Sequence, residues 1–168
     1  MAVYSLYILN KAGGLIYQSD NDRHPGVNKL TANDYLVLAG TLHGVHAITS
    51  RFTTSMIHSH DPNTTNIPAS RLSGPNTNKS GLQSIETDHF NLYVFQTLTG
   101  IKFIVVTSPI PTTNLGRGEL NVQLELANQL FKDLYVLYSD YVMKDPFYSI
   151  DMPIKNPHFD SKIKQLIN

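Results

Sequence analysis

Apolar side chains on both faces mark the predicted strands of this chain. Side chains alternate between the two faces of a strand, so residues 2–9 form two apolar rows. One row is Ala2, Tyr4, Leu6 and Ile8, and the other is Val3, Tyr7 and Leu9. The stretch "IKFIVV" (101–106) has the same pattern. A strand that is apolar on both faces belongs to a sheet that is covered on both sides.

Turn residues separate the predicted strands into hairpins. "NKAGG" (10–14) links the first strand to "LIYQS" (15–19), and "TLTG" (97–100) links a strand at 89–96 to one at 101–107. Glycine and asparagine are typical of such turns. A further strand is predicted at 82–87, which gives five in all.

Helical periodicity predicts three helices. The first spans about 33–56, where Thr31, Asn33 or Asp34 can cap its start. The second spans 119–143, and Asp145-Pro146 ends it. A third, short helix is predicted at 159–167. The core face of the second steps by three and four residues: Leu120, Leu124, Ala127, Phe131, Leu134, Tyr138 and Tyr141.

The predicted order is β-β-α-β-β-β-α-α in a single domain, residues 1–168. It indicates an α/β (α+β) fold, a five-stranded sheet with one helix on one face and the C-terminal helices on the other. Residues 59–81 are rich in Pro, Asn, Ser and Thr and are expected to form a mobile polar loop. The first helix is expected to face the sheet with its larger apolar residues: Leu38, Leu42, Val45, Ile48, Phe52 and Met56.

Composition narrows the possible functions. Lys+Arg and Asp+Glu number 13 each, so the formal charge is zero and no basic surface for nucleic acid or anionic membrane is predicted. The absence of cysteine excludes disulfides, thiolate zinc sites and cysteine nucleophiles. "MAVYSLYIL" lacks a basic flank and is too short to span a bilayer, so a cytoplasmic protein is expected.

No group of residues predicts catalysis, a metal site or a cofactor. His43 and His46 lie three apart on the first helix, but a metal site needs a third or fourth ligand, and His46 is expected in the core. The run His58–Asp61 lies at the start of the polar loop, and a mobile loop does not hold metal ligands in a fixed geometry. "GPNTNKSG" (74–81) lacks the glycine that precedes lysine in a phosphate-binding loop.

Two glycines in the first helix require an explanation. Each costs about 1 kcal/mol of helix stability relative to alanine. Gly40 and Gly44 share one face with Ala47 and Arg51, and His43 lies at the rim. Two interpretations remain open: a side-chain-poor surface on which a partner protein docks, or close packing inside the domain.

The second long helix carries a further apolar stripe, Leu126, Leu130 and Leu137. With the core face, it covers more of the helix than the roughly 100° that a surface helix buries. We expect the last helix to cover part of this stripe and a neighbouring subunit to cover the rest.

Three segments resemble one family. "NKAGGLIYQ" (10–18), "ETDHFNLYVFQTLTGIKFIVV" (86–106) and "LYSDYVMKDPFYSIDMPI" (137–154) are similar to the synbindin-type longin subunit of the TRAPP vesicle-tethering complex. Longin domains have the element order predicted above. Animal members carry a long insertion before the first helix, where this chain has only residues 20–33.

The resemblance implies a function without covalent catalysis. It implies a core subunit, peripheral at endoplasmic reticulum and Golgi membranes through the complex, that acts in vesicle transport between them. Its implied partners are other TRAPP subunits, among them a second, smaller longin subunit, and a Rab-family GTPase whose nucleotide exchange the joined surface catalyses. The first helices of both longins would face the GTPase, which would give Gly40, His43, Gly44, Ala47 and Arg51 a role.

Two alternatives come from other classes. A longin-like structural or adaptor subunit of a vesicle coat, or a SNARE-regulating module, would share the architecture without exchange activity. The coat subunits would show sequence blocks different from the three quoted. A small metal-dependent enzyme would require the histidines to converge in space.

Overall fold

The structure is a computed structural model that describes residues 1–21, 23, 30–58, 81–109 and 117–168. Side chains are described for all of these except 53–58 and 117–121. The elements follow the predicted order: β1 Val3–Leu9, β2 Leu15–Asp20, α1 Ala32–His58, β3 Ser84–Glu86, β4 Asn91–Gln96, β5 Lys102–Thr107, α2 Arg117–Tyr138 and α3 Pro157–Ile167. One π-helical turn, η2 Ser139–Met143, extends α2.

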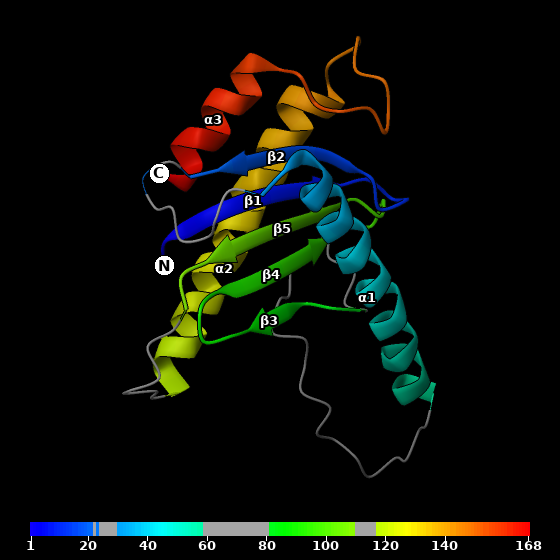
Figure 1. Ribbon diagram of the computed structural model, residues 1–168, viewed down its shortest axis with the longest axis vertical. Helices are drawn as coiled ribbons and strands as arrows, with labels where there is room; N and C mark the ends of the chain where they lie inside the picture. The colour runs from blue at the N-terminus through cyan, green and yellow to red at the C-terminus, as the bar shows by residue number, and fades with distance from the viewer. Residues whose placement is uncertain (22, 24–29, 59–80, 110–116) are drawn as a thin grey trace.

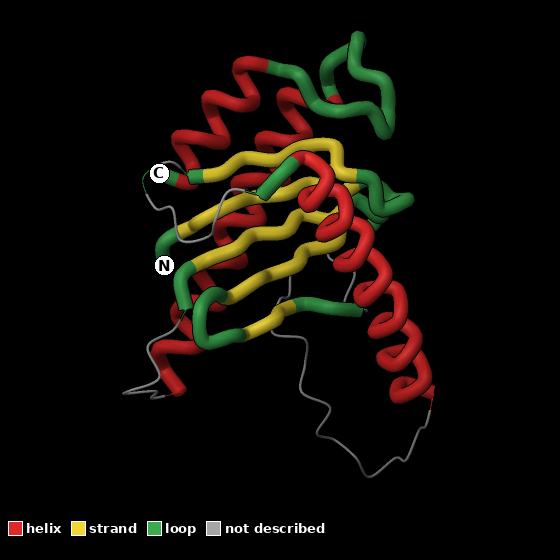
Figure 2. The backbone as a smooth tube through the Cα atoms, in the orientation of Figure 1, coloured by secondary structure: helices red, strands yellow, loops and turns green. Residues whose placement is uncertain are grey.

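The five strands form one antiparallel sheet in the order β2-β1-β5-β4-β3. Helix α1 covers one face, while α2 and α3 cover the other (Figures 1 and 2). The predicted α-β-α sandwich is therefore confirmed. No helix in the described part of the chain is both long and apolar enough to cross a membrane.

Each face of the sheet has its own hydrophobic core. The larger core joins β1, β2, β4 and β5 to α2 and α3, and includes the fully buried Phe103, Phe131 and Phe159. The smaller one lies under α1 and includes Leu9, Leu92 and Ile104. The core face predicted for α2 is confirmed at Ala127, Phe131, Leu134 and Tyr138, which are all buried.

The simple alternation predicted for β1 is wrong at its start. A register shift between Val3 and Ser5 places two residues of β1 against one of β5. A β-bulge of this kind reverses the facing of the residues before it. Val3 therefore lies in the core under α2 and α3, with Leu6, while Tyr4 packs on the α1 side.

The face that α1 turns to the sheet also differs from the expectation. Tyr35, Ala39, Leu42 and His46 are buried. Val45, Ile48 and Phe52, which were expected in the core, are exposed by 37%, 58% and 63%; the side chain of Met56 lies outside the described residues. Figure 1 shows why: α1 crosses the sheet from β2 and its C-terminal half runs on beyond β3, where no strand of the described residues lies beneath it.

Candidate interaction surfaces

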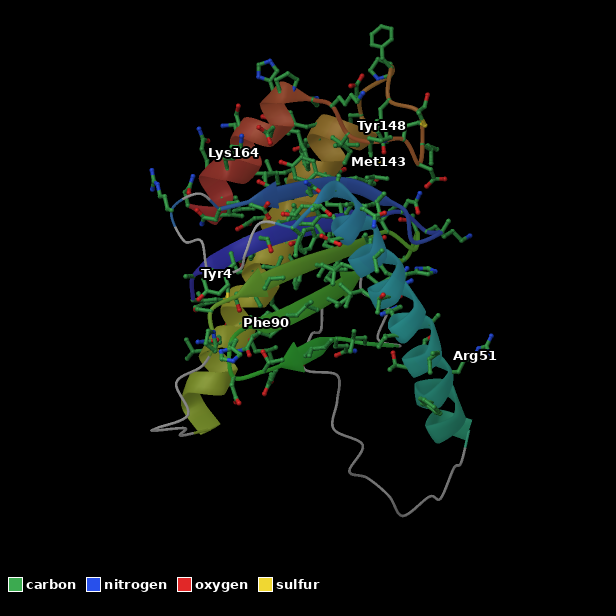
Figure 3. All side chains as sticks on the ribbon, in the orientation of Figure 1. Tyr4, Arg51, Phe90, Met143, Tyr148 and Lys164 are labelled. Atoms are coloured by element: carbon green, nitrogen blue, oxygen red, sulfur yellow. The ribbon has the colours of Figure 1, made fainter. Side chains whose placement is uncertain are left out.

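The side of α1 that points away from the sheet is apolar. Its residues, which we call the α1 outer face, are Val37, Gly40, Gly44, Ala47, Ile48, Arg51 and Phe52. Val37 and Ile48 are exposed by 61% and 58%, and Arg51 points away from the sheet in Figure 3. Large apolar side chains that gather exposed on one side of a helix are typical of an interface.

The two glycines of this face do not serve packing within the described chain. A Cβ atom built at Gly40 or at Gly44 meets no atom within 4 Å. Close packing, one of the two interpretations left open by the sequence, is therefore excluded for the described residues. The remaining interpretation is a flat strip that allows a partner backbone to approach closely.

His43 does not share the exposed strip. Its ring lies against the β1–β2 turn, because a Cβ atom at Gly13 (φ +90°) would lie 2.6 Å from its Cγ. The His43 Nδ1 atom is buried and has no hydrogen-bond partner among the described residues. Burial lowers the pKa of His43, and the neighbouring Lys102 and His46 lower it further. The neutral ring is therefore favoured, and His43 supports the turn instead of facing a partner.

Lys102 is a buried lysine that the sequence pattern did not single out. It is only 3% exposed, although it lies in β5 between apolar residues. Within the described part of the chain, its Nζ donates one long hydrogen bond, 3.4 Å, to the carbonyl of Gly100. Burial lowers its pKa. A single long bond is weak compensation for a buried ammonium group.

His46 is a core histidine, as predicted. It is 5% exposed, and its ring nitrogens contact the Leu82 carbonyl at 3.2 Å and Gln96 Oε1 at 2.5 Å. Both nitrogens are occupied by the chain itself. Within the described ranges, no three His, Asp or Glu side chains are placed to hold a metal ion. The run His58–Asp61 and the stretch 74–80 lie outside the residues whose side chains are described.

The structure divides the leucine stripe of α2. Leu130 is buried and belongs to the chain's own core, and Leu137 packs against that core half-exposed. Leu126 alone is well exposed, by 48%. It lines a hollow of about 340 Å³ with Met1 and Leu166. Leu126 is therefore the most exposed of the three, and Leu137 keeps part of its surface accessible.

The sequence reasoning missed a second exposed apolar region, the segment 143–152 between η2 and α3. Phe147, Ile150 and Met152 are exposed by 93%, 74% and 57%. Figure 3 places Met143 and Tyr148 at the end of the molecule away from Arg51. This segment has no regular periodicity, so only its apolar composition, "FYSIDMPI", could have drawn attention to it.

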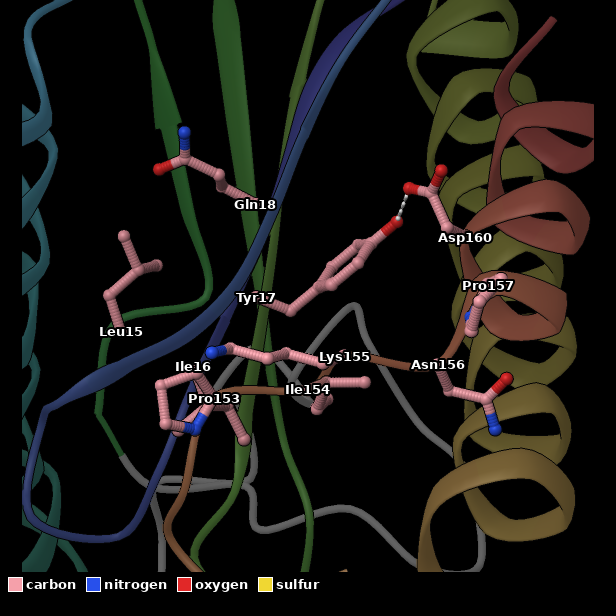
Figure 4. A pocket seen from close by; sticks show the side chains of 10 residues that line it. All are labelled: Leu15, Ile16, Tyr17, Gln18, Pro153, Ile154, Lys155, Asn156, Pro157 and Asp160. Atoms are coloured by element: carbon pink, nitrogen blue, oxygen red, sulfur yellow. Dashed lines mark hydrogen bonds between the residues drawn. The ribbon is translucent and has the colours of Figure 1, made fainter.

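Two hollows adjoin this region. One, of about 510 Å³, lies between β2 and the segment 153–157 and is lined by Leu15, Tyr17 and Gln18 on its β2 side (Figure 4). The other, of about 410 Å³, is lined by Tyr141, Phe147 and other residues of the apolar segment. The hollows share residues 153–157. Both hollows therefore border the segment 153–157 at this end of the molecule.

Comparisons with known proteins identify a family and several relatives to which this chain is similar. The sequence model of the Sybindin-like family matches residues 3–168. Trafficking protein particle complex subunit 4 of Dictyostelium discoideum is 40% identical over 167 residues, which are 99% of this chain and 97% of that protein. The human protein of the same name is 32% identical over 139 residues, 83% of this chain. The chain spans about half (48%) of the length of this human relative.

A second subunit name occurs among the relatives. Trafficking protein particle complex subunit 1 of Dictyostelium discoideum is 27% identical over 165 residues, 98% of this chain and 91% of that protein. Among solved structures, a Roadblock/LC7 domain from Streptomyces avermitilis aligns with a TM-score of 0.41 and 11% identity, covering 81% of this chain and 88% of that one.

Proposed function

Because the chain belongs to the Sybindin-like family, we propose that it is a core subunit of a trafficking protein particle complex that acts in transport between endoplasmic reticulum and Golgi. With a second, smaller longin subunit it forms the surface that catalyses nucleotide exchange on a Rab-family GTPase. It works at the cytoplasmic side of these membranes and associates with them through the complex.

Two kinds of similarity support this assignment. The chain aligns over nearly its whole length with proteins named as subunit 4 and, more distantly, with proteins named as subunit 1 of the same complex. Two subunits of related sequence have related folds. Two related domains can pair through equivalent surfaces, as in pseudo-symmetric dimers.

The α1 outer face is the observation that carries the proposal. It exposes Val37, Ile48 and Phe52 beside two glycines with open space above them. Such a strip suits close approach by a helix, since small residues let two backbones come near each other while the apolar neighbours are buried. The C-terminal half of α1 extends past the sheet (Figure 1), which leaves it accessible to a partner longin and a GTPase together.

Exchange does not require an acid, a base or a nucleophile. An exchange factor accelerates nucleotide release by binding the nucleotide-free GTPase more tightly than the nucleotide-bound form. A surface that contacts the GTPase can supply this difference in affinity by shape and burial alone. Each chain contributes only part of such a surface, so the subunit alone is expected to be inactive.

The direct test is GDP release from the Rab protein, followed with a fluorescent nucleotide. We expect no acceleration by this chain alone and acceleration when the smaller longin subunit and the rest of the core complex are added. Full activity of the isolated chain would contradict the shared surface. An assembled complex that binds the GTPase without accelerating release would favour the structural or adaptor role.

A further inference from the structure

The outer edge of β2 has an unpaired backbone position at Gln18. The Asn21 amide donates to the Tyr4 carbonyl at 2.8 Å, so residues 17, 19 and 21 turn their backbone groups toward β1. The Ile154 amide donates to the Ile16 carbonyl at 2.8 Å from the other side. Alternation along the strand therefore directs the N–H and C=O of Gln18 outward. No described residue accepts from or donates to them.

The chain covers this edge at Ile16, and α3 approaches it beyond Asp20, whose backbone also faces outward with no partner among the described residues. At one end, the extended segment around Ile154 contacts Ile16. At the other, the Asn21 side chain donates to the Ile167 carbonyl at 2.8 Å, which joins the end of α3 to β2. Unpaired strand edges are sites at which another strand can add, and proteins usually cover them. The open stretch, Gln18 and Asp20, therefore lies between the contact at Ile16 and the contact at Asn21.

The open edge lies beside the 510 Å³ hollow. Leu15, Ile16, Pro153, Ile154 and Pro157 give this hollow largely apolar walls (Figure 4). A strand that pairs with Gln18 would place every second side chain against these walls, which is the arrangement of β-strand addition. None of the residues that line this hollow or its neighbour belongs to α1.

We propose that this surface binds an extended segment of a partner polypeptide, which pairs its backbone with Gln18 and buries alternate apolar side chains in the hollow. The bound partner segment continues past residues 153–157 of this chain to the exposed Phe147 and Met152, which line the second hollow. A lipid surface is a poorer occupant, because acyl chains cannot form hydrogen bonds with the N–H and C=O of Gln18, whereas a polypeptide backbone can. The site is separate from the α1 outer face, and this inference does not depend on the proposed exchange activity.

The test uses the full chain and a phage-displayed library of random 12-residue peptides. Selected peptides should alternate apolar residues, and their binding should slow hydrogen exchange of the Gln18 amide. Gln18→Pro removes the outward N–H without removing a bond to β1, and should weaken binding at least 10-fold. Gln18→Ala keeps the N–H and should bind within 2-fold of the wild type. Val37→Asp, on the α1 outer face, should have no effect.

N-methylation of the peptide provides a second measurement, which holds even if Gln18→Pro fails to fold. Two peptides are compared, each methylated on one of the two sets of alternate backbone nitrogens. One set should abolish binding and the other should be tolerated, because only every second N–H faces β2. Three outcomes would overturn the proposal: no selected peptide, protection confined to α1, or binding that is indifferent to both Gln18→Pro and the methylation register.

Discussion

The Tyr17 hydroxyl donates a 2.9 Å hydrogen bond to Oδ1 of Asp160, which lies 143 residues away in the sequence (Figure 4). This bond joins the edge strand β2 to the first turn of α3. The Tyr17 ring also meets the Phe159 ring edge-on, with centroids 5.0 Å apart. Together these contacts hold α3 beside the open edge of the sheet.

Replacement of Tyr17 by phenylalanine should separate the stability contributed by the hydrogen bond to Asp160 from that of the ring contact with Phe159. Tyr17→Phe keeps the ring contact and removes the hydrogen bond, so the free energy of unfolding should fall by about 1–2 kcal/mol. Urea denaturation measures the change. Tyr148→Phe, which removes a hydroxyl bond to the exposed Met152 carbonyl, is the matched control and should cost less. Equal losses in the two variants would mean that the Tyr17–Asp160 bond adds no particular stability.

Replacement of Gly40 and of Gly81 by alanine should change the free energy of unfolding in opposite directions. At Gly40 a methyl group meets open space in the middle of a helix, so Gly40→Ala should raise the free energy of unfolding by about 0.5–1 kcal/mol. Gly81 has φ +89°, and its Cβ would lie 2.6 Å from the His46 ring. Gly81→Ala should therefore cost about 1–2 kcal/mol from backbone conformation alone. Thermal unfolding of both variants checks the pair, and stabilisation by Gly81→Ala would contradict the structure.

Lys102→Met should stabilise the fold. The buried ammonium group has one long hydrogen bond, to the Gly100 carbonyl, and methionine fills a similar volume without a charge. The free energy of unfolding should rise by about 1 kcal/mol or more. Lys155→Met, at an exposed position, is the control and should change little. A fall in the free energy of unfolding with Lys102→Met, measured by urea denaturation, would contradict the prediction.

Stability should fall in mildly acidic solution because of His43. Its pKa in the folded chain lies below the ordinary 6.5, chiefly through burial and secondarily through Lys102 and His46. The unfolded chain then binds more protons just below pH 6.5, so the free energy of unfolding decreases as pH falls through this window. His43→Gln should make the decrease less steep, whereas His89→Gln, at an exposed position, serves as the control. Parallel curves for wild type and His43→Gln would contradict the prediction.

Gly44→Arg tests the α1 outer face in the proposed exchange reaction. The substitution adds a long side chain where a Cβ meets nothing within the described chain, so the fold should survive with its melting temperature unchanged or raised. GDP release by the complex that contains the variant should slow at least 10-fold, because the partner can no longer approach closely. Gln165→Arg, at an exposed position of α3, is the matched control. Normal exchange with Gly44→Arg would remove this strip from the proposed surface.

The sequence alone determined the element order, the sandwich architecture and the core face of α2. These follow from local patterns: strands that are apolar on both faces must be covered twice, and Ala127, Phe131 and Leu134 recur at helical spacing only on one side. The core position of His46 could also be predicted, because its face of the helix is a local property. The family resemblance agrees with these elements because its three segments cover the β1–β2 turn with most of β2, the hairpins from the end of β3 to β5, and the approach to α3.

Only the tertiary structure decided which side of α1 is buried and where β2 remains open. Large apolar residues occur on both the buried and the exposed side of α1, so periodicity cannot distinguish Leu42, which is buried, from Phe52, which is exposed. The choice depends on where the sheet ends beneath the helix, and this is a contact between distant segments. The bulge at Tyr4, the burial of Leu130 and the unpaired edge at Gln18 have the same origin. Each is set by a neighbour that the local sequence does not contain.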